Sequence, residues 1–336
     1  CVSAPTGSGG EADTIRVGTY QAFVDAPSTS AGEWVKEEFE SRTDKTLEWV
    51  VRENELNEFI QRRQRGASMD ADAYLGVTPQ DLVRANAALS DDRPLFEGVD
   101  TSQVENAGNI VEAYRFDPQN RVLPTGASYV CIVYDEGEVE PPTSFDDLLT
   151  SDYADSLLLS NPESTATGLD FLLWSIKAKG ADAYLDYWTE LLDNGVRVLG
   201  SWSDAYAAYS EGEAPMVVSF STDQVYAAAE DQDMSRHQIA FLNDQGYAYV
   251  DGVGKFATTE RDSLVQRFVN FMLEPDVQRE TAVQNVGIPT VSNASLPEQY
   301  QQYVHVPDEP VQFEYDALAA NMQTWRDDWA RMAASR

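Results

Sequence analysis

Aromatic and amide side chains follow several apolar runs in this sequence, at positions where they could hold a small ligand. Tyr20 follows IRVGT, Asn54 follows the run TLEWVV, Trp202 follows VRVLG and Tyr226 lies six residues after PMVVSF. Open α/β sheets bind ligands outside the carboxyl ends of their strands. Each aromatic ring attracts a cation by ~0.5–2 kcal/mol. The pattern favours an aromatic box for a flat or cationic ligand, although a single aromatic is more often part of a core.

The segment NPESTATGLDFLLW (161–174) passes from an apolar run into a helix. Backbone N–H groups at the start of that helix, with the hydroxyls of Ser164, Thr165 and Thr167, could hold a phosphate or carboxylate. The alternative is capping alone, in which Thr165 or Thr167 satisfies the helix's own donors. Trp202 lies at the start of another predicted helix, with Ser203 as its cap.

Groups that could catalyse a reaction are scarce. His237 and His305 lie in polar stretches and are expected at the surface, and Cys131 lies in the apolar run SYVCIVY, where we expect a buried free thiol. The sequence has no CxxC, GxSxG, Walker loop or GxGxxG after a strand. It therefore predicts no catalytic residue, no cofactor and no metal site.

The elements that would position the ligand groups alternate between strand and helix from the start. Strand–helix–strand–helix–strand implies parallel pairing with right-handed crossovers, as in an open α/β sheet. We expect strands at 15–20, 46–51 and 71–77, with helices at 32–42 and 53–66.

A second lobe is predicted to begin at the strand 127–137 and to end with a return strand at 247–256. Inside it we expect strands at 156–162, 196–200 and 215–220, and helices at 168–180 and near 181–193; helices at 261–283 and 315–334 follow. The predicted division is an anchor and tether at 1–13, lobe 1 at 14–126 plus about 252–310, and lobe 2 at 127–251 plus about 311–336. Two such lobes would close on a ligand in the cleft between them.

The charge of the chain is strongly negative. Lys+Arg number 23 against 57 Asp+Glu, a formal net charge of -34. Such a charge disfavours nucleic acid and anionic membranes as partners. Near 1 M salt the Debye length is about 3 Å, so the repulsion between the carboxylates is largely screened and the folded chain can tolerate its charge. The composition therefore indicates a halophilic protein.

The sequence has no apolar run long enough to span a membrane. It begins at Cys1, followed by the small polar segment VSAPTGSGGEAD, as in a processed lipoprotein. We expect a monomer that contacts the outer face of the membrane only through a lipid on Cys1.

Several segments follow one another along the chain: TYQAF (19–23), NPESTATGLDFLLW, GSWSDAYAAYSEGE with MVVSFSTDQVYA, FVNFMLEPDVQ (268–278) and WRDDWARMAAS (325–335). In these segments and their order, the chain resembles the thiamine-binding periplasmic protein family. The resemblance runs from about residue 14 to 335. It implies a type II periplasmic-binding-protein fold that passes thiamine, or a thiamine phosphate ester, to the membrane permease of an ABC importer. The implied ligand contacts are Tyr20, Asn54, Glu55, Thr165, Ala166, Trp202, Phe220, Ser221, Thr222, Asp223 and Tyr226. The chain departs from the family pattern at Ala166, Phe220 and Val286.

Other functions on the same fold remain open at this point. Related folds capture ferric ion with paired tyrosines, but only Phe220 and the single Tyr226 follow PMVVSF. An acidic cleft with aromatic rings would also suit a polyamine. A thiamine-degrading enzyme would need a nucleophile, for which Cys131 is the one internal candidate. A surface adhesin would be supported by repeats, and the sequence shows none.

Overall fold

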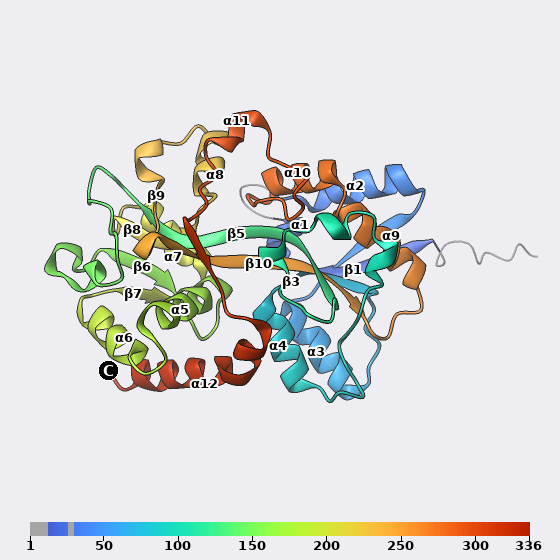
Figure 1. Ribbon diagram of the computed structural model, residues 1–336, viewed down its shortest axis with the longest axis horizontal. Coiled ribbons are helices and arrows are strands. Elements are labelled where there is room, and N and C mark those ends of the chain that lie inside the picture. The colour runs from blue at the N-terminus through green and yellow to red at the C-terminus, as the bar shows by residue number, and fades with distance from the viewer. Residues whose placement is uncertain (1–12, 26–29) are drawn as a thin grey trace, which may run out of the picture. The chain divides into compact units, whose positions relative to one another are not determined.

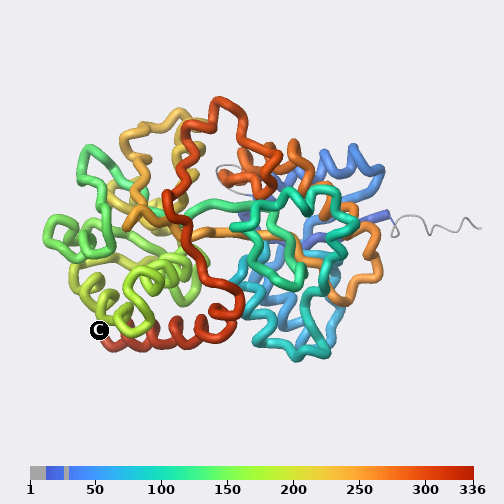
Figure 2. The backbone as a smooth tube through the Cα atoms, in the orientation of Figure 1, coloured from blue at the N-terminus to red at the C-terminus, as the bar shows by residue number. Residues whose placement is uncertain are grey.

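A computed structural model describes residues 13–25 and 30–336, so Cys1 and nearly all of the predicted tether lie outside the described residues. The chain divides into two compact units. Unit 1 comprises Cys1–Ala127 and Val250–Leu296, and unit 2 comprises Ser128–Tyr249 and Pro297–Arg336. The chain passes from one unit to the other inside two long strands, β5 (Val122–Tyr134) and β10 (Gln245–Phe256) (Figures 1 and 2).

The last change of unit falls earlier in the sequence than the expected position near residue 310. The cause is the pairing of β11 (Glu309–Val311), whose three residues align with Gln245–Tyr247 of β10 in unit 2. The segment before it also bonds to unit 2, since the His305 backbone N donates to Ser221 O. The end of unit 1 is therefore Leu296.

Unit 1 is built on a mixed sheet in the order β2, β1, β3, β10. Strand β1 (Thr14–Thr19) pairs in parallel with β2 (Thr46–Val51) and β3 (Ala73–Val77), as the alternation of strands and helices predicts. Strand β10 runs antiparallel to β3 and also pairs with the short β4 (Phe96–Glu97). The carboxyl ends of the three parallel strands consequently lie at one edge of this sheet.

The helices of unit 1 pack on this sheet through aromatic residues. Phe39 of α2 meets Phe268 of α9 edge to face at 5.6 Å between ring centroids, and Trp49 of β2 meets the same Phe268 at 6.2 Å. The α-helices are α1 (Gln21–Val24), α2 (Gly32–Thr43), α3 (Glu55–Arg65), α4 (Pro79–Ala88), α9 (Asp262–Met272) and α10 (Pro275–Gln284). Short 3-10 turns lie at Thr101–Gln103, Ala107–Asn109 and Glu112–Tyr114.

The single helix expected over 261–283 is wrong, because the chain forms two helices there. Pro275 has no N–H to continue the first helix, and it disfavours the helical region for the residue before it. Glu274 accordingly has an extended backbone (φ -65, ψ 135). The break separates α9 from α10, which carries Thr281 and is followed directly by Asn285.

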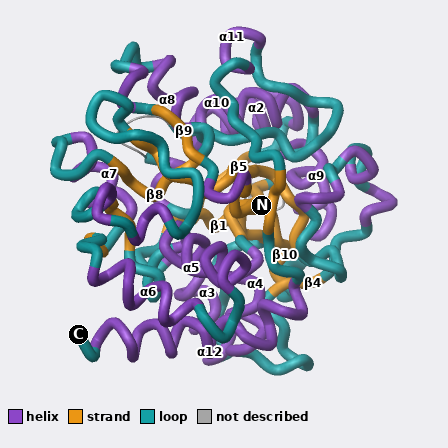
Figure 3. The backbone as a smooth tube through the Cα atoms, turned by 60° about the vertical axis from the view of Figure 1, so that its left-hand side comes forward, coloured by secondary structure: helices purple, strands orange, loops and turns teal. Residues whose placement is uncertain are grey.

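Unit 2 repeats the α/β arrangement with the strand order β5, β8, β6, β7, and β9 also pairs with β5. Figure 3 labels β5, β8 and β9 among the strands of this unit. β8 (Met216–Phe220), β6 (Leu157–Ser160) and β7 (Arg197–Leu199) are parallel to one another, whereas β5 pairs antiparallel with both β8 and β9 (Gln238–Ala240). The carboxyl ends of β6, β7 and β8 therefore also meet at one edge.

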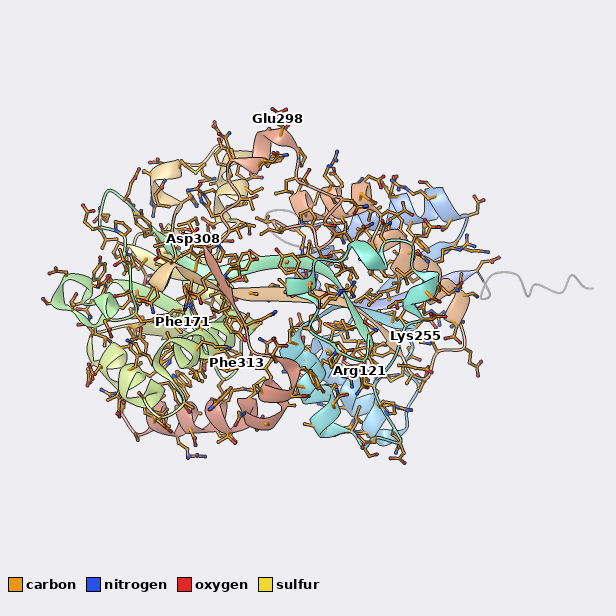
Figure 4. All side chains as sticks on the ribbon, in the orientation of Figure 1. Arg121, Phe171, Lys255, Glu298, Asp308 and Phe313 are labelled. Atoms are coloured by element: carbon orange, nitrogen blue, oxygen red, sulfur yellow. The ribbon has the colours of Figure 1, made fainter. Side chains whose placement is uncertain are left out.

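Helix α5 is the central helix of unit 2. Every residue from Thr167 to Ile176 in it is buried, and Phe171 packs edge to face on Trp174 and Trp188 (Figure 4 labels Phe171). The other α-helices are α6 (Tyr184–Asp193), α7 (Trp202–Ser210), α8 (Asp223–Ala229), α11 (Glu298–Gln301) and α12 (Tyr315–Ala334). Short 3-10 turns lie at Asp147–Leu149, Ser151–Tyr153, Met234–Arg236 and Leu242–Asp244.

The few basic residues are largely paired with carboxylates. Arg121 Nη2 lies 2.8 Å from Oδ1 of the buried Asp117, and Lys255 Nζ lies 2.8 Å from Asp262 Oδ1 (Figure 4). None of the helices within residues 13–25 and 30–336 combines the length and apolar character that a bilayer crossing requires.

Candidate functional site

Unit 1 presents polar groups just beyond the carboxyl ends of its parallel strands. Tyr20 follows β1, Asn54 directly precedes α3 after β2, and Thr78 caps α4 after β3. Thr78 and Asp81 form a reciprocal capping box, with Asp81 N donating to Thr78 Oγ1 at 3.1 Å. The structure thus brings the sequence-predicted residues Tyr20, Asn54 and Glu55 to the same edge of the unit 1 sheet.

Two residues at this edge have strained backbones. Glu55 has φ +47 and Val286 has φ +50, in the left-handed region that residues with side chains seldom adopt. For a β-branched residue such as Val286 this conformation is a true outlier. Strain of this kind costs on the order of 1–3 kcal/mol and is concentrated at functional sites.

Tyr20 is held by its neighbours at both ends of the side chain. Its ring lies against Gly76, where a Cβ would come within 2.6 Å of the ring carbons and where φ is +101. Asn285 Nδ2 donates a 2.9 Å hydrogen bond to its hydroxyl. Burial and the charge of Asp251 raise the pKa of Tyr20, so its hydroxyl stays protonated at any physiological pH. Tyr20 is thus a neutral aromatic ring in a fixed place.

A group of carboxyl side chains lies near Tyr20. Asp251, on β10, is only 7% exposed. Burial, and then the charge of Asp81, raise its pKa from 3.8 to about 7. Burial and Asp81 also raise the pKa of Glu55. Asp81 itself is paired with Arg84. Asp251 was not predicted from the sequence; the available signal was a charged residue inside the otherwise apolar and glycine-rich run YAYVDGVG.

A small cavity of about 20 Å³ lies within unit 1 beside these groups. It is lined by polar side chains of Tyr20, Asp251, Thr281 and Asn285 as well as by apolar groups. Thr281 Oγ1 is buried there without a hydrogen-bond partner among the described residues. A cavity of this size has room for about one water molecule.

In unit 2, Trp202 is the first residue of α7 and sits between two other rings. It lies 5.1 Å from Tyr206 and 6.1 Å from Phe220, measured between ring centroids, and its Nε1 donates to Ser219 Oγ at 3.2 Å. The cap of α7 is Ser201, whose Oγ accepts from Asp204 N at 3.0 Å, so the expected cap at Ser203 is wrong. Ser201 precedes the helix with an extended backbone, as a capping residue must, whereas Ser203 already lies inside it.

The helix start after β6 is capped by its own threonine. Gly168 N donates to Thr165 Oγ1 at 3.1 Å, and that hydroxyl lies 2.8 Å from Ser160 Oγ. Of the two interpretations of this segment, the structure shows the capping one for Thr165. Ala166 is the first residue of α5, and Thr167 is buried.

The predicted contacts after β8 differ in exposure. Phe220 is partly exposed and meets Tyr249 edge to face at 5.2 Å, and Tyr226 on α8 is also partly exposed. Ser221 and Thr222 are fully buried. Thr222 Oγ1 lies 3.1 Å from Ser128 Oγ, whereas Ser221 Oγ has no partner among the described residues.

Asp223 and His237 form a buried pair that the sequence analysis did not foresee. His237 Nδ1 lies 2.6 Å from Asp223 Oδ2, and Tyr206 OH donates to Asp223 Oδ1 at 2.5 Å. The expectation of a surface position is therefore wrong for His237, which is 8% exposed. His305 is partly buried and lies 2.7 Å from Gln224 Oε1. The polar residues next to each histidine in the sequence gave no indication of these contacts, which are made with residues elsewhere in the chain.

The thiol of Cys131 is free and completely buried in β5. Burial and the charge of Asp223 raise its pKa well above the usual value, so the nucleophilic thiolate is disfavoured. Among the described residues, no group of three or more His, Cys, Asp or Glu side chains is arranged to hold a metal ion.

Comparison with known proteins shows similarity over nearly the whole chain. The thiamine-binding periplasmic protein of Escherichia coli (strain K12) is 28% identical over 323 residues, which cover 96% of this chain and 94% of that protein. The thiamine-binding periplasmic protein of Brucella suis biovar 1 (strain 1330) is 25% identical over 321 residues, covering 94% and 91%. These matches confirm the resemblance found in the sequence.

Solved structures give the same result for the fold. A periplasmic thiamin binding protein superposes with a TM-score of 0.80 at 26% identity, covering 95% of this chain and 96% of that one. A ferric binding protein from Campylobacter jejuni has a TM-score of 0.77 at 15% identity, covering 95% and 99%, which is a likeness of fold alone. The predicted type II periplasmic-binding-protein fold is confirmed.

The family profile described as bacterial extracellular solute-binding protein matches residues 34–308. The match includes nearly all of the strands and helices that position the polar groups of both units. By this match the chain belongs to the family of bacterial extracellular solute-binding proteins.

Proposed function

We propose that this solute-binding protein binds thiamine outside the cell and delivers it to the permease of an ABC importer. The observation that carries the proposal is the edge of the unit 1 sheet, where the neutral ring of Tyr20 lies near the carboxyl groups of Glu55 and Asp251, with Asp81 close to both carboxyl groups. A thiazolium cation is attracted both by an aromatic face and by carboxylates. The full-length thiamine-binding relatives support the same ligand.

The groups proposed to contact the ligand differ in what they offer. Tyr20, Trp202, Phe220 and Tyr226 offer aromatic surface, and Asn54, Glu55 and Asp223 offer polar groups. Thr165, Ala166, Ser221 and Thr222 are proposed to act through their backbones, because Ala166 has no polar side-chain group and the hydroxyls of the other three are committed to a cap or buried.

We also propose that the protein releases its ligand unchanged. Chemistry on thiamine would require an activated nucleophile. The internal cysteine is fully buried and its raised pKa disfavours the thiolate. Aromatic and hydrogen-bonding contacts bind substrate and transition state alike, which does not accelerate a reaction.

Calorimetric titration in 2 M KCl with thiamine, thiamine monophosphate, spermidine and ferric citrate tests the proposed ligand. We expect thiamine to bind at least a hundredfold more tightly than spermidine or ferric citrate. Trp202→Ala should weaken thiamine binding at least tenfold, or about 1.4 kcal/mol, whereas Trp188→Phe, inside the core of unit 2, should leave the affinity unchanged. Tighter binding of ferric citrate or spermidine would refute the proposal.

A further inference from the structure

Asp251 is a buried acid whose surroundings do not neutralise it. Asp81 from α4 and Tyr20 after β1 interact with it electrostatically, and Glu55 at the start of α3 interacts in turn with Tyr20, Asp81 and Arg84. Arg84 is paired with Asp81. No Lys or Arg is among the described residues that line the cavity next to Asp251. Burying a carboxylate without a charged partner is unfavourable, so its presence calls for a role other than stability.

The backbone around Asp251 is arranged to leave room for its carboxyl group. At Gly126 on the neighbouring strand β5, a Cβ would come within 3.0 Å of Asp251 Oδ1. On the other side, β10 pairs with the end of β3, where Gly252 aligns with Val77. Asp251 therefore lies at the carboxyl end of β3, the same edge of the sheet that carries Tyr20 and Glu55.

A second observation at this place points to a polar occupant. The 20 Å³ cavity is lined by Asp251 and Tyr20 together with Thr281, which is 7% exposed and whose hydroxyl has no partner among the described residues. A buried hydroxyl without a partner costs free energy unless a water or ligand group satisfies it. The carboxyl group of Asp251 and the ring of Tyr20 thus share one polar cavity.

From this geometry we propose that Asp251 is a specificity-determining residue, whose negative charge next to Tyr20 selects a cationic ligand over a neutral one of the same shape. The inference rests on the proposed function, since it concerns the same ligand. An aromatic face attracts a cation but also accepts a neutral ring. A carboxylate out of contact with bulk water interacts more strongly with a cation than it would in water, and it offers a neutral ring no such attraction.

The experiment compares thiamine with a neutral isostere in which thiophene replaces the thiazolium ring. At pH 8.5 in 2 M KCl, Asp251→Asn should weaken thiamine binding at least tenfold and change binding of the isostere less than twofold. Asp91→Asn, the same change at an exposed position of unit 1, should alter neither affinity. Equal weakening of both ligands by Asp251→Asn, or no weakening of either, would overturn the proposal.

A pH series on the wild-type protein tests the inference without a substitution. Because the pKa of Asp251 is about 7, its carboxyl group is mostly protonated at pH 6 and mostly ionised at pH 8. The ratio of thiamine affinity to isostere affinity should rise at least fivefold over this range, and a flat ratio would contradict the role of Asp251. If the wild-type protein binds the isostere but not thiamine, the inference fails; if it binds neither, the proposed function itself is refuted.

Discussion

Replacing Asp251 by asparagine should stabilise the unliganded protein at neutral and alkaline pH. The side chain is buried, and its pKa is raised from 3.8 to about 7 in the folded chain. Between these two values the folded state holds a proton that the unfolded state has released. The contribution of Asp251 to the free energy of unfolding therefore falls as pH rises from about 4 to about 7, and the whole loss is present above pH 7.

The size of the effect follows from the pKa difference. Each pKa unit corresponds to about 1.4 kcal/mol, so a rise of roughly three units represents about 4 kcal/mol of lost stability above pH 7. Asparagine has nearly the same volume and no charge, so Asp251→Asn removes this loss. The variant should exceed the wild type by up to about 4 kcal/mol at pH 8 and by little at pH 4.

Urea unfolding of both proteins between pH 4 and pH 8.5 provides the measurement, with 2 M KCl throughout to hold the screening of the other charges constant. Asp91→Asn serves as the matched control, and its unfolding free energy should follow that of the wild type at every pH. A difference between Asp251→Asn and wild type that stays constant from pH 5 to pH 8 would refute the reasoning. So would a variant that is less stable at pH 8.

Three further predictions concern other parts of the molecule. Tyr206→Phe removes the hydrogen bond to the buried Asp223 and should lower the unfolding free energy by about 1–3 kcal/mol in urea; an unchanged value would mean that Asp223 does not depend on this hydroxyl. With a formal net charge of -34, the melting temperature should fall as KCl is diluted from 4 to 0.1 M, and a flat profile would argue against halophilic adaptation. The thiol of Cys131, fully buried with a raised pKa, should react with a thiol reagent only after unfolding, and prompt reaction in the native state would contradict its burial.

Local patterns in the sequence were sufficient to predict many of the helices and strands. The run TLEWVV and the helix Tyr315–Ala334 occur at the residues expected, because both have clear apolar periodicity and are bounded by residues that end them. β5 begins at Val122, five residues before the expected start. Pro124 and Gly126 in that segment are typical of loops, and only the pairing with neighbouring segments makes them part of a strand.

The candidate site was harder to predict, because its polar groups depend on contacts that are distant in sequence. Tyr20 could be placed after a strand from its local pattern, but Asn285, which bonds to it, is 265 residues away. His237 looks like a surface residue among Ser235, Arg236 and Gln238, but it is buried with its Nδ1 2.6 Å from Asp223 Oδ2. The acid in the apolar run YAYVDGVG was a local sign of burial, but the polar cavity that it lines is formed with residues distant in sequence and could not be predicted from that run.

The pairing of β3 with β10 has a consequence for how the chain acquires its structure. Leu75 pairs with Val253, and a ribosome working at about 5–20 residues per second needs roughly ten to forty seconds to make the chain between them. Until β10 arrives, one side of β3 is an open edge, which is prone to pair with other chains. The first 127 residues thus lack a strand that their own sheet requires, and unit 1 reaches its native state only once residues 250–296 have been synthesised.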